Sequence, residues 1–205
     1  TFLVTEPGEI IRNELGGHAS ETLVGFSGKE RAIGAAAASQ ASTNAKNTIS
    51  NLHRLLGAQG DMKSVSVQYG GETREFSAEA IVAMFLVKLQ SLVARKSMES
   101  ADAEQKANSE HQPVPVRFAF ALPTWYGNQQ KRALLDAVAI AGIGTSESAA
   151  GVELIDSADC LCAVFARKHP VGNEEKRRTH CFIDLGHTHL TITMARFFSS
   201  SSASS

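Results

Sequence analysis

The stretch Cys181-Phe-Ile-Asp-Leu-Gly-His-Thr-His-Leu-Thr-Ile-Thr-Met-Ala-Arg-Phe197 joins two apolar segments through a short polar turn. In the first segment, Asp184 interrupts the apolar run just before Gly186. In the second, apolar and threonine side chains alternate from Leu190 to Met194. A period of two is the signature of a β-strand, and a glycine between two such segments is typical of a tight turn. The stretch therefore predicts a strand, a turn and a returning strand.

Asp184 gives this hairpin a candidate chemical role. A carboxylate at the end of a buried strand, beside a turn whose backbone N–H groups face outward, can hold a magnesium-bound phosphate. The alternative is an ordinary hairpin in which Asp184 is only a turn residue. The stretch alone favours the ordinary hairpin, so support for phosphate binding has to come from the rest of the chain.

Composition restricts the class of protein. The chain has 205 residues and a net charge of about −1, so nothing in it calls for a nucleic acid or an anionic membrane as partner. No apolar run approaches the ~20 residues of a membrane span. The three cysteines cannot all pair, which indicates core thiols in a reducing compartment. We expect a soluble, cytoplasmic protein.

The periodicity along the chain predicts an α/β fold in which helices flank a mixed central sheet. We expect one domain over residues 1–198 and a disordered serine-rich tail over 199–205, which can bury nothing. Strands are predicted at 2–4, 10–11, 22–26, 65–69, 114–120 and 152–155, before the final hairpin. Helices are predicted at 31–40, from about 45 to 56, from Ser77 onward, at 128–141 and at 157–168.

Four ordered blocks resemble one known family. They are Ala32–Gly57, Gly71–Phe76, Phe120–Arg132 and Phe182–Thr188. Together they are similar to the ATPase domain of the seventy-kilodalton heat-shock chaperones, and more so to that of their hundred-and-ten-kilodalton relatives. The resemblance implies the first lobe of an actin-like, ribonuclease-H-like ATPase domain. The chain starts after the strand with which the family begins, so we predict that this first strand is lacking.

The resemblance also implies ATP or ADP with Mg²⁺ as cofactors. It places Asp184 at the metal and Gly186, His187, Thr188 and Arg54 at the nucleotide.

The family's catalytic groups are less well matched. His53 replaces a lysine that orients the γ-phosphate, and a neutral, shorter histidine is a poor substitute. Either Asp156 or Ser157 occupies the position of the family's water-holding glutamate; alternatively, one of them simply caps a helix. No residue is therefore assigned as catalytic, and we expect weak or absent ATPase activity.

Three functions follow from these patterns. The first is the ATP-binding lobe of a hundred-and-ten-kilodalton-type chaperone. By resemblance, such a protein exchanges nucleotide on a seventy-kilodalton partner and holds unfolded clients through other domains. The second is an ATP-hydrolysing seventy-kilodalton-type chaperone. The third, a minor alternative, is a metal-binding module built on His180, His187 and His189.

Overall fold

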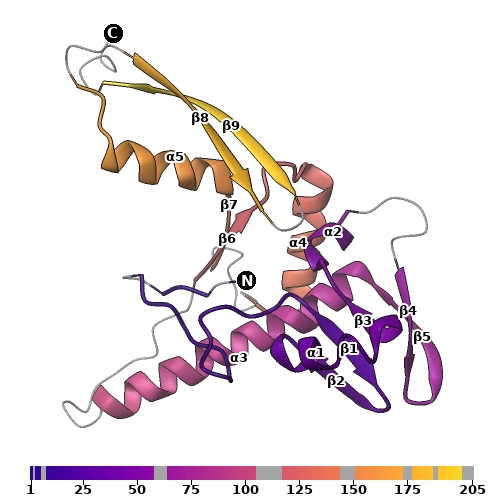
Figure 1. Cartoon of the computed structure of the whole chain (residues 1–205). Helices are drawn as coiled ribbons and strands as arrows, with labels where there is room; N and C mark the ends of the chain where they lie inside the picture. The colour runs from indigo at the N-terminus through magenta and orange to yellow at the C-terminus, as the bar shows by residue number, and fades with distance from the viewer. Residues whose placement is uncertain are drawn as a thin grey trace. The chain divides into compact units, whose positions relative to one another are not determined.

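The computed structural model describes residues 1, 3–5, 8–57, 64–104, 117–143, 151–172, 177–186 and 189–199. These residues form two compact units. Unit 1 comprises Thr1–Arg117 and Gly127–Gly151, and unit 2 comprises Phe118–Tyr126 and Val152–Ser205. Both units contain helices as well as strands (Figure 1), which confirms the α/β class. In the described part of the chain, no helix is both long and apolar enough to cross a bilayer.

Unit 1 contains a small antiparallel sheet with the order β2-β1-β3. Its strands are β1 (Val24–Ser27), β2 (Glu30–Ile33) and β3 (Thr48–Ile49), and helix α1 (Ala35–Gln40) follows β2. The predicted helix at 31–40 is therefore wrong in its first half. The chain turns at Gly34, whose φ of 68° favours glycine, and only then becomes helical.

The helix predicted from residue 45 is also wrong. The structure has a 3₁₀ turn η1 (Ala45–Asn47), then β3, then the one-turn helix α2 (Leu52–Leu55). Two asparagine side chains explain the difference, because they bond to the backbone of other strands. Asn44 Nδ2 donates to the Phe26 carbonyl at 2.7 Å, and Asn47 Oδ1 accepts from the Gln68 N–H at 3.0 Å. Such bonds compete with a continuing helix.

The two longest helices pack together beside a second hairpin in unit 1. Strands β4 (Ser64–Tyr69) and β5 (Glu72–Ser77) are joined at Gly70 and Gly71, both with positive φ, as predicted. Helix α3 (Ala78–Glu104) starts behind Ser77, whose hydroxyl accepts the Ala80 N–H, and it contacts α4 (Asn128–Ile140). The predicted apolar stripe on α3 is buried: Ile81, Phe85, Leu89 and Leu92.

The described residues of unit 2 form two strand pairs and one helix. Strand β6 (Phe118–Leu122) is parallel to β7 (Val152–Asp156), and α5 (Ser157–Lys168) follows β7 directly. Strands β8 (Arg177–Leu185) and β9 (Leu190–Phe198) form the predicted hairpin. Phe165 of α5 packs against the inner face of this hairpin, with ring centroids 4.7 Å from His180, 5.0 Å from Phe182 and 5.4 Å from Phe197.

Several predictions need correction or stay open. The described strands are divided between one three-stranded sheet and three pairs, whereas a single central sheet was expected. At the N-terminus, the predicted hairpin is reduced to one bridge between Val4 and Ile10. The cysteines are free as predicted, but none of them is in the core: Cys160 and Cys162 are half-buried, and Cys181 is exposed on the hairpin. Ser199 is buried, and residues 200–205 lie outside the described part of the chain.

Candidate functional site

The turn between β8 and β9 is closed by its own backbone. Leu185 pairs with Leu190, and the Gly186 N–H donates to the His189 carbonyl at 2.9 Å. A Cβ atom on residue 186 would lie 3.1 Å from that carbonyl oxygen, so glycine fits here better than any other residue. The Gly186 amide is engaged within the turn. Amides available to a ligand would have to come from His187 and Thr188, which lie outside the described residues.

Asp184 lies at the turn end of the hairpin and is exposed to solvent. It pairs with Thr191, and the alternation along β8 places it on the inner face that also carries Phe182. Its carboxylate forms no hydrogen bond or ion pair with another residue of the described ranges. Apolar side chains therefore do not enclose it, and it is available to a cation.

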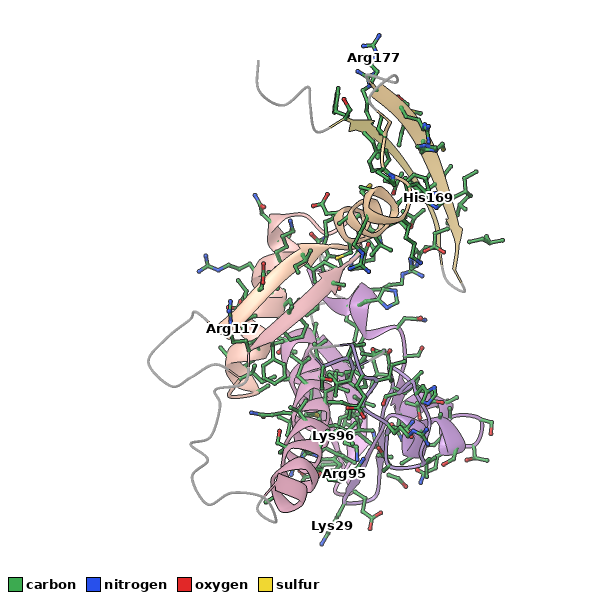
Figure 2. The ribbon with its side chains drawn as sticks, turned by 90° about the vertical axis from the view of Figure 1, so that its left-hand side faces the viewer. Lys29, Arg95, Lys96, Arg117, His169 and Arg177 are labelled. Atoms are coloured by element: carbon green, nitrogen blue, oxygen red, sulfur yellow. The ribbon has the colours of Figure 1, made fainter. Side chains whose placement is uncertain are left out.

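Charge is separated along the hairpin. Arg177 stands at the end away from the turn (Figure 2), and Arg178 and Arg196 also lie toward that end. The turn end carries Asp184. The start of α5 lies at this same end of unit 2 (Figure 1), and it brings the acidic side chain of Asp159 in its first turn. These carboxylates would repel a free phosphate. A divalent cation bound between them and the phosphate would offset that repulsion.

The role of Asp156 at the start of α5 is now defined. Its Oδ1 accepts the Ala158 N–H at 2.8 Å, and its backbone is extended, with φ −71° and ψ 134°. These are the features of an N-cap residue. Of the two residues proposed from the sequence as the cap, Asp156 fills that role and Ser157 is the first residue of the helix.

Arg54 lies on the short helix α2 of unit 1, which is anchored by buried leucines. Leu52 and Leu56, four residues apart, are 2% and 3% exposed and anchor the segment, so Arg54 faces solvent. Gly57 ends it with φ 68°, and an added Cβ would lie 2.8 Å from Gln130 Cγ on α4. The close contact between Gly57 and Gln130 holds α2 against α4, and the exposed Arg54 guanidinium is therefore carried by a fixed helix. Arg54 can pair with a phosphate as a bidentate fork.

The predicted nucleotide contacts are thus divided between the units. Arg54 belongs to unit 1, whereas Asp184 and Gly186 belong to unit 2.

The histidines predicted as a possible metal site are differently placed. His180 packs between Phe165 and Phe197, and its buried Nε2 has no hydrogen-bond partner among the described residues. His189 is exposed beyond the turn, and His187 lies outside the described residues. In the part of the chain that the structure describes, no three His, Cys, Asp or Glu side chains gather as a metal site would require.

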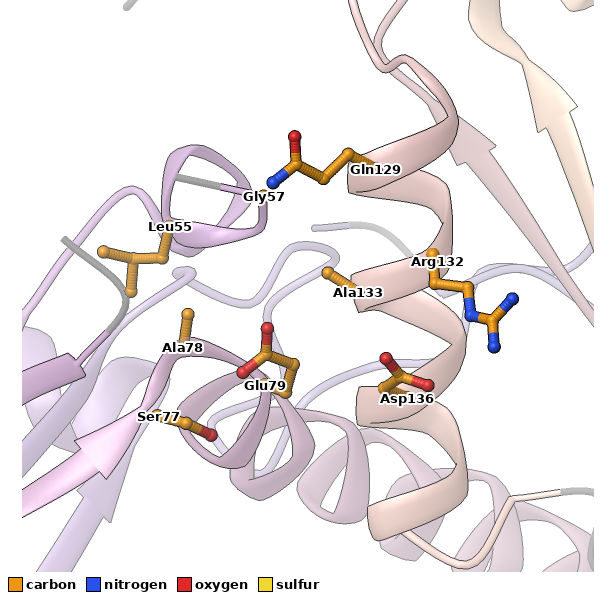
Figure 3. Close-up of a pocket in the computed structure, with 9 residues that line it drawn as sticks. All are labelled: Leu55, Gly57, Ser77, Ala78, Glu79, Gln129, Arg132, Ala133 and Asp136. Carbon is orange, nitrogen blue, oxygen red and sulfur yellow. The ribbon is translucent and has the colours of Figure 1, made fainter. Parts of the chain in front are cut away.

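Unit 1 also contains a cavity of about 450 Å³ next to α2 (Figure 3). Its walls come from the end of α2, the start of α3 and one side of α4; the lining residues are Leu55, Gly57, Ser77, Ala78, Glu79, Gln129, Arg132, Ala133 and Asp136. Sequence reasoning did not find this feature, because the three contributing segments share no motif.

The comparisons with known proteins bear on the fold and on the resemblance. The family model described as Hsp70 protein matches residues 3–147. The chain belongs to the Hsp70 family. This match includes Arg54 and the cavity, and it ends before α5 and the β8–β9 hairpin.

Curated relatives extend the similarity over nearly the whole chain. A heat shock protein homolog of Candida glabrata is 31% identical over 92% of this chain and 28% of its own length. Heat shock protein hsp88 of Neurospora crassa is 29% identical over 92% of this chain and 27% of its own. A heat shock protein homolog of Saccharomyces cerevisiae is 28% identical over the same shares as the Candida protein. These relatives confirm the predicted resemblance; the chain spans only about 28% of the length of the first of them.

Proposed function

We propose that this chain is an ATP-binding part of a heat-shock chaperone of the larger Hsp70-type branch. In this proposal the protein binds ATP or ADP with Mg²⁺, promotes ADP release from a seventy-kilodalton partner and holds unfolded proteins. ATP acts mainly as a conformational ligand, and its hydrolysis is slow or absent.

The observation that carries the proposal is the exposed Asp184 carboxylate beside the tight Gly186 turn. Mg²⁺ commonly binds through one or two carboxylates and substrate phosphates while keeping several waters, so a single accessible aspartate suits it. Bound there, Mg²⁺ would neutralise negative charge on the phosphates. The acidic turn end then makes nucleotide binding depend on the metal.

Slow hydrolysis follows from the chain's own side chains. Arg54 supplies a permanent positive charge for phosphate binding, whereas His53 cannot supply a lysine's charge at neutral pH. Asp156 already uses one carboxylate oxygen to cap α5. Losing a charged or proton-transferring group of this kind typically costs about 10²- to 10⁴-fold in rate.

The relatives support the chaperone part of the proposal. Proteins named as heat shock protein homologs in yeasts, and the heat shock protein named hsp88, align with most of this chain. This chain spans about 28% of the length of the first of these relatives, so we propose nucleotide exchange and client holding for the full-length protein.

Two measurements on the full-length protein that carries this chain test the proposal. In the first, Mg-ATP affinity is measured for the wild type and for Asp184→Asn, with Glu153→Gln, an exposed acid of β7 in the same unit, as a matched acidic control. We expect Asp184→Asn to weaken Mg-ATP binding by at least about tenfold and the control to bind like the wild type. Equal affinities for all three proteins would overturn the role of Asp184.

In the second, release of labelled ADP from a seventy-kilodalton chaperone is followed beside single-turnover ATP hydrolysis. Accelerated ADP release with slow turnover supports the proposal. Fast turnover without an effect on release would instead favour the ATP-hydrolysing chaperone.

A further inference from the structure

The cavity between α2, α3 and α4 has the size of a ligand site. Its volume of about 450 Å³ lies within the range of roughly 300–1,000 Å³ that is typical of binding pockets. Part of its wall is apolar, from Leu55, Ala78 and Ala133, and the remainder is polar. No part of the proposed nucleotide role uses this space.

Two unpaired carboxylates give the cavity its charge. Glu79 and Asp136 lie between α3 and α4 in Figure 3, and neither forms a hydrogen bond or an ion pair with another described residue. Arg132 lies one helical turn before Asp136, where an ion pair would be expected. Its guanidinium instead extends away from the cavity. The cavity therefore presents two negative charges beside a hydrocarbon wall.

We propose that this cavity binds the side chain of an arginine or lysine from another polypeptide. Such side chains combine an aliphatic stem, which suits the apolar wall, with a cationic head, which suits the two carboxylates. The cavity opens to solvent past the exposed residues Gln129 and Asp136. A side chain can thus enter while its own backbone remains outside along α4. This inference is independent of the proposed function.

The test is an NMR titration of the ¹⁵N-labelled 205-residue chain at low salt with the peptide Gly-Arg-Gly. Its neutral isostere Gly-citrulline-Gly serves as the control ligand. We expect saturable shifts of the lining amides with the arginine peptide, in the millimolar range for so small a ligand, and none with citrulline. Free agmatine distinguishes a polypeptide from a small amine: agmatine binding as tightly as the peptide would overturn the polypeptide assignment.

Four variants localise the effect. Glu79→Gln and Asp136→Asn should each weaken peptide binding by about threefold, and Arg132→Gln should strengthen it by up to about twofold. Glu75→Gln, an exposed acid of β5 outside the cavity, should leave the affinity unchanged. Equal binding of the arginine and citrulline peptides, or an affinity indifferent to both carboxylate variants, would overturn the proposal.

Discussion

Replacing Asp156 separates a capping role from a catalytic one. Its Oδ1 accepts the Ala158 N–H at 2.8 Å at the start of α5, a helix of 12 residues. Asp156→Ala removes this bond and a negative charge at the positive end of the helix dipole, which should cost about 1–2 kcal/mol. Asp156→Asn keeps an acceptor oxygen and loses only the charge. It should cost about 0.5 kcal/mol, and less at high salt.

Hydrogen exchange of the α5 amides measures this loss locally. A helix destabilised by 1–2 kcal/mol opens about 5–30 times more often, and its amides exchange correspondingly faster. Because α3 belongs to unit 1, its amides serve as an internal reference in the same sample. We expect faster exchange in α5 for Asp156→Ala, a small change for Asp156→Asn, and no change in α3.

Two results would refute this reasoning. If Asp156→Ala leaves α5 exchange unchanged, the side chain does not stabilise the helix. If Asp156→Asn, which keeps the capping oxygen, lowers ATP turnover by about 10² or more, then Asp156 performs the role of the family's glutamate in addition to capping the helix. A pure cap predicts unchanged turnover in the asparagine variant.

Three further predictions concern stability and association. Burial alone would raise the pKa of Glu14, but its own backbone N–H and the Lys88 ammonium, 3.1 Å away, outweigh burial and lower it. The ionised Glu14 therefore stabilises the folded state fully above the ordinary glutamate pKa of 4.5, and this stabilisation is lost as pH falls below that value. Glu14→Gln should make the free energy of unfolding less dependent on acid pH, and it should cost about 0.5 kcal/mol at neutral pH. Asn13, 8% exposed, donates one hydrogen bond and accepts two within its loop, so urea unfolding should show Asn13→Ala losing about 2–4 kcal/mol and Asn13→Asp, which keeps the acceptors, losing less. The outer face of the hairpin is apolar and uncovered, so Leu185→Thr with Ile192→Thr should lower both dye binding and self-association in light scattering, and an unchanged signal would contradict this.

Elements set by local chemistry could be predicted from the sequence. The Gly70-Gly71 turn requires positive φ, and the stripe from Ile81 to Leu92 on α3 has helical spacing; the structure confirms both. The segment 45–57 could not be predicted in this way. Its conformation depends on Thr48–Ile49 pairing with β1, and on Asn51 adopting a left-handed φ of 52°. Contacts with residues far along the chain overrode a favourable local helix propensity.

The features of the candidate site also differ in whether one short stretch of sequence encodes them. The Asp184 turn is encoded within one short stretch, so its hairpin and its glycine were predictable. The capping role of Asp156 needed one hydrogen-bond distance to distinguish it from Ser157. The cavity brings together residues 55–57, 77–79 and 129–136, and no single stretch contains enough of it to form a pattern.

In the β8–β9 hairpin, the face that the sequence alternation predicts to be buried is not the face that is buried. On β9 the threonine face, Thr191 and Thr193, is half-buried, whereas Ile192 and Met194 are 63% and 75% exposed. Alternation alone would place the apolar set inward. The threonine face is inward because the opposite strand carries Phe182 on that side, and its ring packs against Phe165 of α5. The contact between Phe182 and Phe165 thus fixes which face of β9 meets the helix. The same orientation leaves Asp184 on the inner face at the turn end, where it is exposed and a metal ion can reach it.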